Sequence, residues 1–506
     1  MGMKKYSIAK NKLLLGIFSG WGAQVVSLAM GIFTMPLFFR YLPKDELGVW
    51  MFFLGTGFFV NLADLGFSPV LGRHLAFALG HGDKSSTNNY EGASYYYRLS
   101  KYVSSITAPL LFVCLFLVGG MFIWSLHLSE ALFESSIVAW AIFSLSQAVT
   151  CHFKYLETTL KGHGEVGWQN MTQTIVQGLT LLGYFIVLHF LMGGVIALSV
   201  VILGRNIANA FLVWLLLQKR IDQMHMAKVK IVWHDVKPHI RPALDMFLLT
   251  LGAFLILNTD QYFIVKFLGT AQLPDYAAAY RLVQITYTFA ATAATMCAPF
   301  ISRKSAAGDH AGIRRVLMLN ITVGMLIQLA AVSVLAVFGD YVMQFWLGPG
   351  HFVGWGVVWV FCIMLTLENH HAIFAHFGLS AKNDPTWGKM SLISGAINLV
   401  FTFIGVKWFG LIGVAVSTML AQMLTNNWYA VVKTMRIVNL RFSDYVQESG
   451  VIWFVTGIVL LAAMFSVRSL ISGPAASLLT GITVAVLLCC SVIYLYLKKM
   501  LVTTRP

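Results

Sequence analysis

Ionisable and polar side chains recur at helical spacing inside stretches that are otherwise apolar. Between Gly57 and Gly72, the residues Asn61, Asp64 and Ser68 follow one another at steps of three and four, which places them on one face of a helix. A carboxylate in such a stripe can bind a proton or a sodium ion, or it can pair with a cation on a neighbouring helix. The stripe therefore indicates either an ion-coupling site or a structural clamp.

Cations recur in similar stretches, where a buried charge must face other protein or water. Arg281 opens a polar stripe, Lys154 lies in an earlier stretch, and Arg205 falls near the middle of another. Lys154 can instead form a clamp with Glu157, and Arg73 can be an anchor that reaches the headgroups. These four cations are candidates for an interior cavity, and the family resemblance described below implies a substrate-binding role for Arg205, Arg281, Lys154 and Arg73.

Two more carboxylates are candidates for ion coupling beside Asp64. Asp260 is expected at the same depth as Arg281, so an ion pair between them is predicted, with an interhelical clamp as the alternative. Glu368 lies in a cluster with three histidines, which can titrate or can only pack. Neither this cluster nor the six cysteines have the spacing of metal ligands, so no metal site is expected.

The elements that carry these residues must be membrane-spanning helices. Of 506 residues, 58% are hydrophobic and 11% are charged, and the mean hydropathy is +0.75; a soluble domain has about 25% charged residues. A helix needs about 20 apolar residues to cross a bilayer. The sequence predicts about fourteen such spans, at 13–39, 47–73, 99–127, 131–160, 168–190, 194–217, 243–267, 275–300, 313–338, 352–379, 388–407, 410–433, 449–468 and 475–497.

The two halves of the chain are predicted to be similar. The segment RYLPKDELGVW from Arg40 aligns without gaps with KFLGTAQLPDY from Lys266, and GGVIALS ending at Ser199 matches LIGVAVS ending at Ser417. Repeated halves are common in transporters, although apolar helices can resemble one another by chance. The expected fold is all-α and polytopic, with pseudo-symmetric six-helix lobes at 1–220 and 221–440 and two additional transmembrane helices at 441–506.

Positive charge gathers on one side of the predicted membrane. Most of the 35 lysines and arginines lie in the N-terminal segment and in loops on the same side, including 218–242 and 302–315. This distribution predicts that both termini are cytoplasmic, and it accounts for the net charge without a nucleic-acid partner. The loops contain no Walker motif, nucleophile elbow or pair of catalytic acids. Neither an enzyme nor a cofactor is expected.

Three segments together resemble a known family. They are FRYLPKDELGVW in the first loop, DLGFSPVLGRHLA in the second span and YAAAYRLVQ at the start of the eighth. Over essentially the whole chain they resemble Wzx-type polysaccharide flippases of the multidrug, oligosaccharidyl-lipid and polysaccharide exporter superfamily. The resemblance implies a V-shaped pair of six-helix lobes around a cationic cavity, in the cytoplasmic (inner) membrane of a bacterium. Asp64, Arg73 and Arg281 match the family pattern.

The resemblance also implies a cargo and partners. The implied function is translocation of undecaprenyl-pyrophosphate-linked oligosaccharide repeat units by alternating access, for O-antigen, capsule or exopolysaccharide synthesis. Related peptidoglycan-precursor flippases place arginines in the first helix, whereas Leu13–Phe39 contains neither Arg nor Lys. Diphosphate contacts are therefore expected from Arg205, Arg281 and Lys154, and lipid II is a less expected cargo. Expected partners are the lipid-linked oligosaccharide, membrane lipid, and a polysaccharide polymerase with its chain-length machinery.

Energy coupling and helix bending complete the expected mechanism. A proton or a sodium ion is expected to bind at Asp64, Asp260 or Glu368. Bends are expected at Pro69 and Pro299, since proline removes a helical hydrogen bond.

Two other functions remain open. A cation-coupled drug exporter of the same superfamily would favour an acidic, aromatic-lined cavity, which Arg205 in mid-span disfavours. A membrane-embedded polymerase or glycosyltransferase usually carries a large extracytoplasmic loop with catalytic residues. The longest such loop here, around GDYVMQFWLGPGHFVGWG, holds one acid and one histidine.

Overall fold

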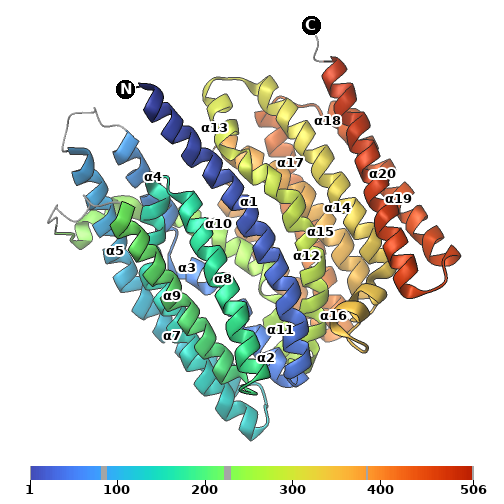
Figure 1. Ribbon diagram of the computed structural model, residues 1–506, viewed down its shortest axis with the longest axis horizontal. Helices are drawn as coiled ribbons and strands as arrows, with labels where there is room; N and C mark the ends of the chain where they lie inside the picture. Colours follow the sequence, from blue (N-terminus) through green and yellow to red (C-terminus); the bar gives the residue numbers. More distant parts are fainter. Residues whose placement is uncertain (1, 81–87, 221–229, 383, 385, 504–506) are drawn as a thin grey trace. The chain divides into compact units, whose positions relative to one another are not determined.

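The computed structural model describes residues 2–80, 88–220, 230–382, 384 and 386–503, and the regular structure in these ranges is entirely helical (Figure 1). The chain forms two compact units. Unit 1 extends to Phe254 and includes Gly269–Leu273, while unit 2 contains Leu255–Leu268 and the chain from Pro274 onward.

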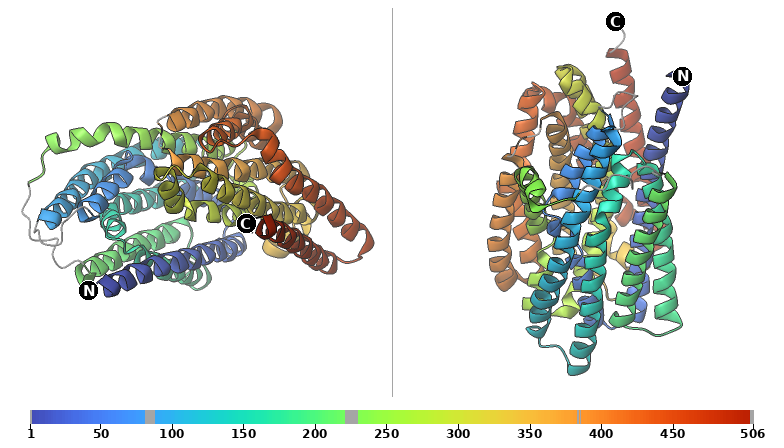
Figure 2. Two further views of the ribbon diagram at one scale, coloured as in Figure 1. Left: turned by 90° about the horizontal axis from the view of Figure 1, so that it is seen from above. Right: turned by 90° about the vertical axis from the view of Figure 1, so that its left-hand side faces the viewer.

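Unit 1 is built from long helices with several interruptions. Its elements are α1 (Gly2–Tyr41), α2 (Lys44–Thr56), α3 (Phe59–Ala63), α4 (Phe67–Gly80), α5 (Asn88–Cys114), the π-helical turn η1 (Leu115–Gly119), α6 (Gly120–Trp124), α7 (Glu130–Gly162), α8 (Val166–His189), α9 (Val195–Arg220), most of α10 (Trp233–Leu257) and the 3-10 turn η2 (Thr270–Gln272). Helix α7 packs along both α5 and α9 (Figure 2).

Unit 2 continues the all-helical pattern. Its elements are α11 (Asp260–Phe267), α12 (Leu273–Met296), α13 (Ala298–Ala306), α14 (His310–Leu347), α15 (Trp355–Ala381), α16 (Thr386–Leu424), α17 (Asn426–Ile437), α18 (Phe442–Tyr445), the π-helical turn η3 (Val446–Gly450), α19 (Val451–Leu470) and α20 (Pro474–Thr503). Helix α14 packs against α15, α19 and α20.

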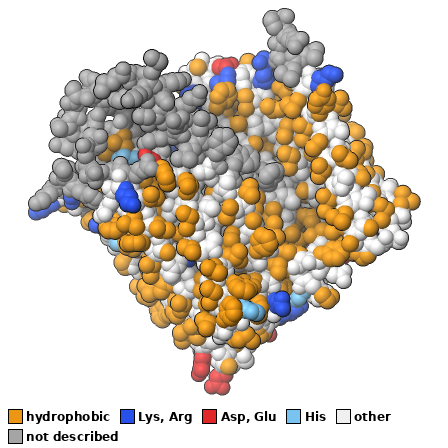
Figure 3. All heavy atoms as spheres, viewed as in Figure 1, with side chains coloured by type: hydrophobic (Ala, Val, Ile, Leu, Met, Phe, Trp, Pro, Cys, Tyr) orange, Lys and Arg blue, Asp and Glu red, His pale blue; other side chains and the backbone are white. Residues whose placement is uncertain are grey.

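Twelve helical stretches of the described chain are long and apolar enough to cross a membrane, compared with about fourteen expected spans. The difference has two sources. The stretch Thr386–Ile437 counts once, although it covers the expected spans 388–407 and 410–433. Helix α12 is long enough, but its polar residues keep it outside the twelve. The protein is a multi-pass membrane protein, and hydrophobic side chains are spread over the whole visible described surface, on which charged side chains are few (Figure 3).

Gly410 makes the reversal that joins the two spans within α16. Its φ of +57° and ψ of −137° lie in a region that glycine adopts readily and side-chain-bearing residues avoid. The two limbs then approach closely, because a Cβ atom on Gly413 would lie only 2.0 Å from the carbonyl oxygen of Gly405. Small residues thus allow the backbones to touch, which stabilises helix pairs where lipid removes the hydrophobic driving force.

Two expected spans are interrupted helices. The span expected at 47–73 consists of α2, α3 and α4, and the span expected at 243–267 ends as α10 at Leu257 and resumes as α11 at Asp260. The prediction of a bend at Pro69 is wrong in its position, because the chain breaks at Leu65–Gly66 and Pro69 lies in the first turn of α4. Pro299 lies in the first turn of α13. The chain breaks just before it, between the end of α12 at Met296 and the start of α13 at Ala298.

An aromatic cluster fixes α2 against α7 in unit 1. Trp50, Phe53, Trp140 and Phe143 are almost fully buried, with ring centroids 5.0–6.3 Å apart. The indole of Trp140 donates a hydrogen bond of 2.9 Å to the carbonyl of Leu115, where the π-helical turn η1 begins. The irregular turn therefore keeps its polar backbone satisfied inside the membrane.

The two loops that align in sequence also meet in space. Helix α2 begins in the first loop and contacts η2, which lies in the second, and both belong to unit 1. The hydroxyl of Thr270 donates a hydrogen bond to the carboxylate of Asp45. Leu47 and Leu273, which the alignment pairs, are 1% and 2% exposed.

Candidate functional site

The polar stripe of the second span contains a break in the helix. Asp64 directly follows the last residue of α3, Leu65 and Gly66 have φ angles of +48° and +77°, and α4 starts at Phe67. A positive φ is rare for a branched residue such as leucine and indicates local strain held by the surrounding structure. Gly66 has no side chain because α10 lies directly against it: a Cβ atom would be 2.2 Å from the carbonyl oxygen of Ala243.

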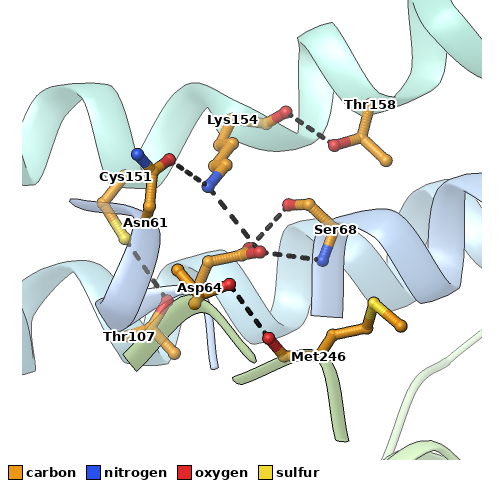
Figure 4. A network of polar contacts seen from close by, with 9 residues as sticks. Asn61, Asp64, Ser68, Thr107, Cys151, Lys154, Thr158 and Met246 are labelled. Carbon is orange, nitrogen blue, oxygen red and sulfur yellow. Dashed lines mark hydrogen bonds and ion pairs between the residues drawn. The ribbon is translucent and has the colours of Figure 1, made fainter. Parts of the chain in front are cut away.

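Asp64 forms a compact network with Lys154 at this break, which we call the Asp64 site (Figure 4). The ammonium of Lys154 on α7 lies 3.7 Å from the Asp64 carboxylate and donates to the side-chain oxygen of Asn61 at 3.3 Å. Ser68 donates to the same carboxylate from its backbone N–H at 3.0 Å and from its hydroxyl at 2.6 Å. Asn61, Asp64 and Ser68 thus share one side of the broken span, as the sequence predicts, although no continuous helix joins them.

The Asp64 site is electrically balanced. One carboxylate, 9% exposed, faces one ammonium, 21% exposed. The bond from the Ser68 N–H also places the carboxylate at the N-terminus of α4, where a negative charge satisfies an otherwise unpaired donor. This geometry suits a structural cap and clamp, and it occupies Lys154 with a protein carboxylate.

Glu157 has a different role from the clamp expected with Lys154. Its two oxygens accept hydrogen bonds from Gln169 on α8 at 3.1 Å and from Asn209 on α9 at 2.9 Å. Glu157 therefore connects three helices of unit 1, while Lys154 pairs with Asp64.

Asp260 in unit 2 is surrounded by neutral donors. Its carboxylate accepts from the phenol of Tyr276 at 2.9 Å and from the hydroxyl of Thr418 at 3.1 and 3.3 Å. The predicted pair with Arg281 is wrong, since Arg281 donates instead to the side chain of Gln284 on its own helix, at 2.9 Å. Within the described chain no lysine, arginine or histidine forms an ion pair with Asp260.

The backbone before Asp260 is held by a buried amide. The fully buried Asn398 on α16 donates to the carbonyls of Leu255 and Ile256, at 2.9 and 3.3 Å. These carbonyls lose their helical partners where α10 ends, so the amide replaces them. The hydroxyl of Thr402 donates in turn to the Asn398 oxygen at 3.3 Å. An oxygen-rich region therefore surrounds the break between α10 and α11.

Three of the four candidate cations have no acidic partner among the described residues. Arg281 is partly buried, whereas Arg205 and Arg73 are exposed. In the part of the chain that the structure describes, none of the three forms an ion pair. An arginine carries five N–H donors, and Arg281 uses one for Gln284. Arg281 is thus the candidate whose position best combines burial with unused donors.

The Glu368 cluster divides into two parts. Glu368 is 9% exposed and lies 3.4 Å from Nδ1 of His371, and the phenols of Tyr280 and Tyr287 are within electrostatic range of it. His370 points elsewhere: its Nε2 lies 2.6 Å from the hydroxyl of Tyr445. Among the described residues, no group of histidine, cysteine and acidic side chains could hold a metal ion.

Sequence inspection did not single out Tyr276 or Thr418. They lie on α12 and α16, and Asp260 lies on α11, so no spacing in the sequence connects them. The sequence held one indirect signal for these two residues. Tyr276 is the last residue of one segment of the internal alignment, and Ser417, the last residue of another segment, directly precedes Thr418.

Known proteins of similar structure share this fold. The lipid II flippase MurJ, in an inward closed conformation, superposes with a TM-score of 0.70 at 14% identity, over 96% of this chain and 100% of that one. An inward-facing multidrug resistance MATE transporter of the MOP superfamily superposes with a TM-score of 0.66 at 15% identity, over 82% and 95%. At these identities the likeness establishes the fold.

Sequence comparison gives a closer relationship. A probable low-salt glycan biosynthesis flippase, Agl15, of Haloferax volcanii is 25% identical over 224 residues. The match covers 44% of this chain and 46% of the relative, so the chain spans about half the length of that protein. Residues 13–305, more than half of the chain, match the family described as "Polysaccharide biosynthesis protein". The resemblance to polysaccharide flippases is confirmed, and the chain belongs to this polysaccharide biosynthesis family.

Proposed function

We propose that the protein is a flippase that moves undecaprenyl-pyrophosphate-linked oligosaccharide repeat units across a bacterial cytoplasmic (inner) membrane by alternating access. The flipped units would supply a polysaccharide polymerase and its chain-length machinery for O-antigen, capsule or exopolysaccharide. The observation that carries the proposal is the match of residues 13–305 to polysaccharide biosynthesis proteins. A glycan flippase among the relatives and the fold shared with a lipid II flippase support it.

The charges of the membrane helices favour an anionic cargo. A diphosphate carries negative charge that a buried cation binds strongly, and Arg281 has no acidic partner among the described residues. Lys154 is less suited to this role because Asp64 already neutralises it. We therefore rank Arg281 and Arg205 above Lys154 and Arg73 as contacts of the head group.

A coupling ion is best placed at Asp260. A carboxylate in the membrane needs a cation, a proton or several donors to offset its lost hydration. Asp64 has Lys154, and Glu368 has His371, whereas Asp260 has two neutral hydroxyls. A proton or a sodium ion at Asp260 would complete its neutralisation, and its release would couple translocation to an ion gradient.

Translocation can be tested in proteoliposomes that contain a labelled undecaprenyl-diphosphate oligosaccharide. The label becomes accessible to an impermeant enzyme when the sugar crosses. Arg281→Gln should lower the rate at least about tenfold, since a charge-assisted hydrogen bond contributes about 1.5–3 kcal/mol. The matched control Arg441→Gln removes an exposed cation of unit 2 and should keep the rate within about twofold.

The rival function, export of cationic drugs, gives the opposite result. The MATE transporters share the fold, so the same vesicles should be tested with a cationic dye. Dye export without movement of the oligosaccharide would overturn the flippase proposal. For coupling, Asp260→Asn should abolish the dependence on a proton or sodium gradient, whereas Asp64→Asn should retain it; the reverse pattern would reject Asp260 as the coupling site.

A further inference from the structure

A cationic cavity lies where four helices of unit 2 end, away from the residues discussed above. Its volume is about 1020 Å³, and its walls come from the end of α13, the start of α14, the end of α15, both ends of α16, and α17. Ser302 and Ser305 of α13 donate to the carbonyls of Ser380 and Ala381 at 2.9 and 2.8 Å. The cavity therefore lies on the same side of the membrane as the basic loop 302–315, which the sequence predicts to be cytoplasmic.

One cation of this cavity is already neutralised. Lys433 lies 3.0 Å from the carboxylate of Asp384, donates to the phenol of Tyr429 at 2.9 Å and also donates to the hydroxyl of Thr386. The backbone N–H of Thr386 and the ammonium of Lys433 together hold the pKa of Asp384 at about 2, so this carboxylate stays ionised.

Two other cations of the cavity have no counter-charge among the residues that the structure describes. Lys382 follows the last turn of α15, Arg436 lies in the last turn of α17, and both are exposed. No acidic side chain pairs with either of them in the described ranges. Because the charges of Lys433 and Asp384 cancel, the two positive charges of Lys382 and Arg436 remain in the cavity. His310 also lines it, and its buried Nδ1 has no hydrogen-bond partner among the described residues.

An apolar strip leads from these cations toward the hydrocarbon. Leu424, Trp428 and Val432 line the same cavity and are 66%, 61% and 43% exposed. They follow one another at four-residue steps, and Trp428 lies about 12 Å along α17 from Arg436, at 1.5 Å per residue. A tryptophan at this depth is typical of the boundary between headgroups and acyl chains.

We propose that this cavity binds an anionic glycerophospholipid of the surrounding bilayer, with its phosphate between Lys382 and Arg436 and an acyl chain along Leu424, Trp428 and Val432. Charge complementarity favours an anionic headgroup over a zwitterionic one. The apolar strip favours a lipid over a free phosphate, because a free anion would gain nothing from it. The cavity volume lies at the upper end of the usual range for ligand pockets, about 300–1,000 Å³, so it has room for a headgroup and its glycerol. Basic pockets between helices on the cytoplasmic side bind such lipids in other membrane proteins.

The proposal is independent of the cargo. It would hold for an exporter as well as for a flippase, because it concerns a resident lipid of unit 2. Binding can be measured by native mass spectrometry of the full chain in detergent, with phosphatidylglycerol, phosphatidylcholine, inorganic phosphate and undecaprenyl diphosphate as separate probes.

The decisive variant is Lys382→Gln with Arg436→Gln. Neither side chain has an acidic partner to lose in the described part of the chain, so the fold should be preserved, and an unchanged unfolding temperature verifies this. Phosphatidylglycerol should bind about 30-fold more weakly to the variant, which corresponds to about 1 kcal/mol for each cation. Phosphatidylcholine should bind weakly to both forms, and Lys382→Arg with Arg436→Lys should retain the affinity.

The matched control is Lys389→Gln with Lys498→Gln. It removes two exposed cations that do not line the cavity, and it should keep phosphatidylglycerol binding within about twofold. An equal loss in the control would overturn the proposal in favour of unspecific charge. Displacement of phosphatidylglycerol by inorganic phosphate would also overturn it. So would a variant that loses undecaprenyl diphosphate and retains phosphatidylglycerol, since the cavity would then bind the cargo.

Discussion

Removing Lys154 should destabilise the protein more than removing the charge of Asp64, although the two groups form one ion pair. In Lys154→Met the Asp64 side chain, 9% exposed, retains only the two donors of Ser68. In Asp64→Asn the ammonium of Lys154, 21% exposed, still reaches Asn61 and some water. The penalty for an unpaired buried charge therefore falls mainly on the lysine variant.

Two estimates set an upper limit on the free energy of unfolding that Lys154→Met should cost. At 3.7 Å two unit charges attract by about 4 kcal/mol at an effective dielectric constant of about 20. A stranded carboxylate can also bind a proton, and for an ordinary aspartic acid with a pKa near 3.9 this costs about 4 kcal/mol at pH 7. Allowing for partial exposure, we expect Lys154→Met to cost about 2–4 kcal/mol. Asp64→Asn should cost less than about 1.5 kcal/mol, because asparagine is as good a helix cap as aspartate.

The assay is reversible unfolding in mixed detergent micelles at several pH values. Because protonation rescues a stranded carboxylate, the penalty of Lys154→Met should shrink by up to about 1.4 kcal/mol per pH unit as the pH falls from 7 toward 5. The double variant Lys154→Met with Asp64→Asn should recover at least about 1 kcal/mol. Lys161→Met, an exposed cation on the same helix, should change stability by less than about 0.5 kcal/mol. A larger penalty for Asp64→Asn than for Lys154→Met, or one independent of pH, would refute the reasoning.

Further predictions concern a glycine and a helix cap. Gly66→Ala should cost more than about 2 kcal/mol, since it adds a clash at 2.2 Å with α10 to a φ of +77°; Gly164→Ala, with a φ of +73° in open space, should cost only about 1 kcal/mol. If thermal unfolding shows equal costs, the clash does not matter. Asp384→Asn should destabilise the protein by a constant amount from pH 8 to about pH 4. The difference should vanish as the pH falls toward 2, because the pKa of Asp384 is held at about 2, below its ordinary value, and its stabilisation is lost on protonation. If the stability difference between the wild type and Asp384→Asn grew as the pH fell, Thr386 and Lys433 would not be the cause of the lowered pKa of Asp384.

The break at Leu65–Gly66 shows where reading the sequence reached its limit. Three- and four-residue steps placed Asn61, Asp64 and Ser68 on one side, and they do meet Lys154 together. The spacing gave no sign of the break, at which α10 packs so closely on Gly66 that a Cβ atom would clash with it. A proline was the local signal available, and Pro69 lies beyond the interruption.

The bilayer environment, the approximate spans and the family could be predicted from the order of the residues. These features are local: a run of apolar residues suits the bilayer whatever its neighbours are, and short segments in a fixed order reveal relatedness. The partners of the charged side chains became known only from the packing of the helices. Lys154 pairs with Asp64 and not with Glu157, and Asp260 bonds to Tyr276 and Thr418. The physical reason is that a contact between two helices depends on how each is rotated and where it breaks, which their packing sets and their separate sequences do not.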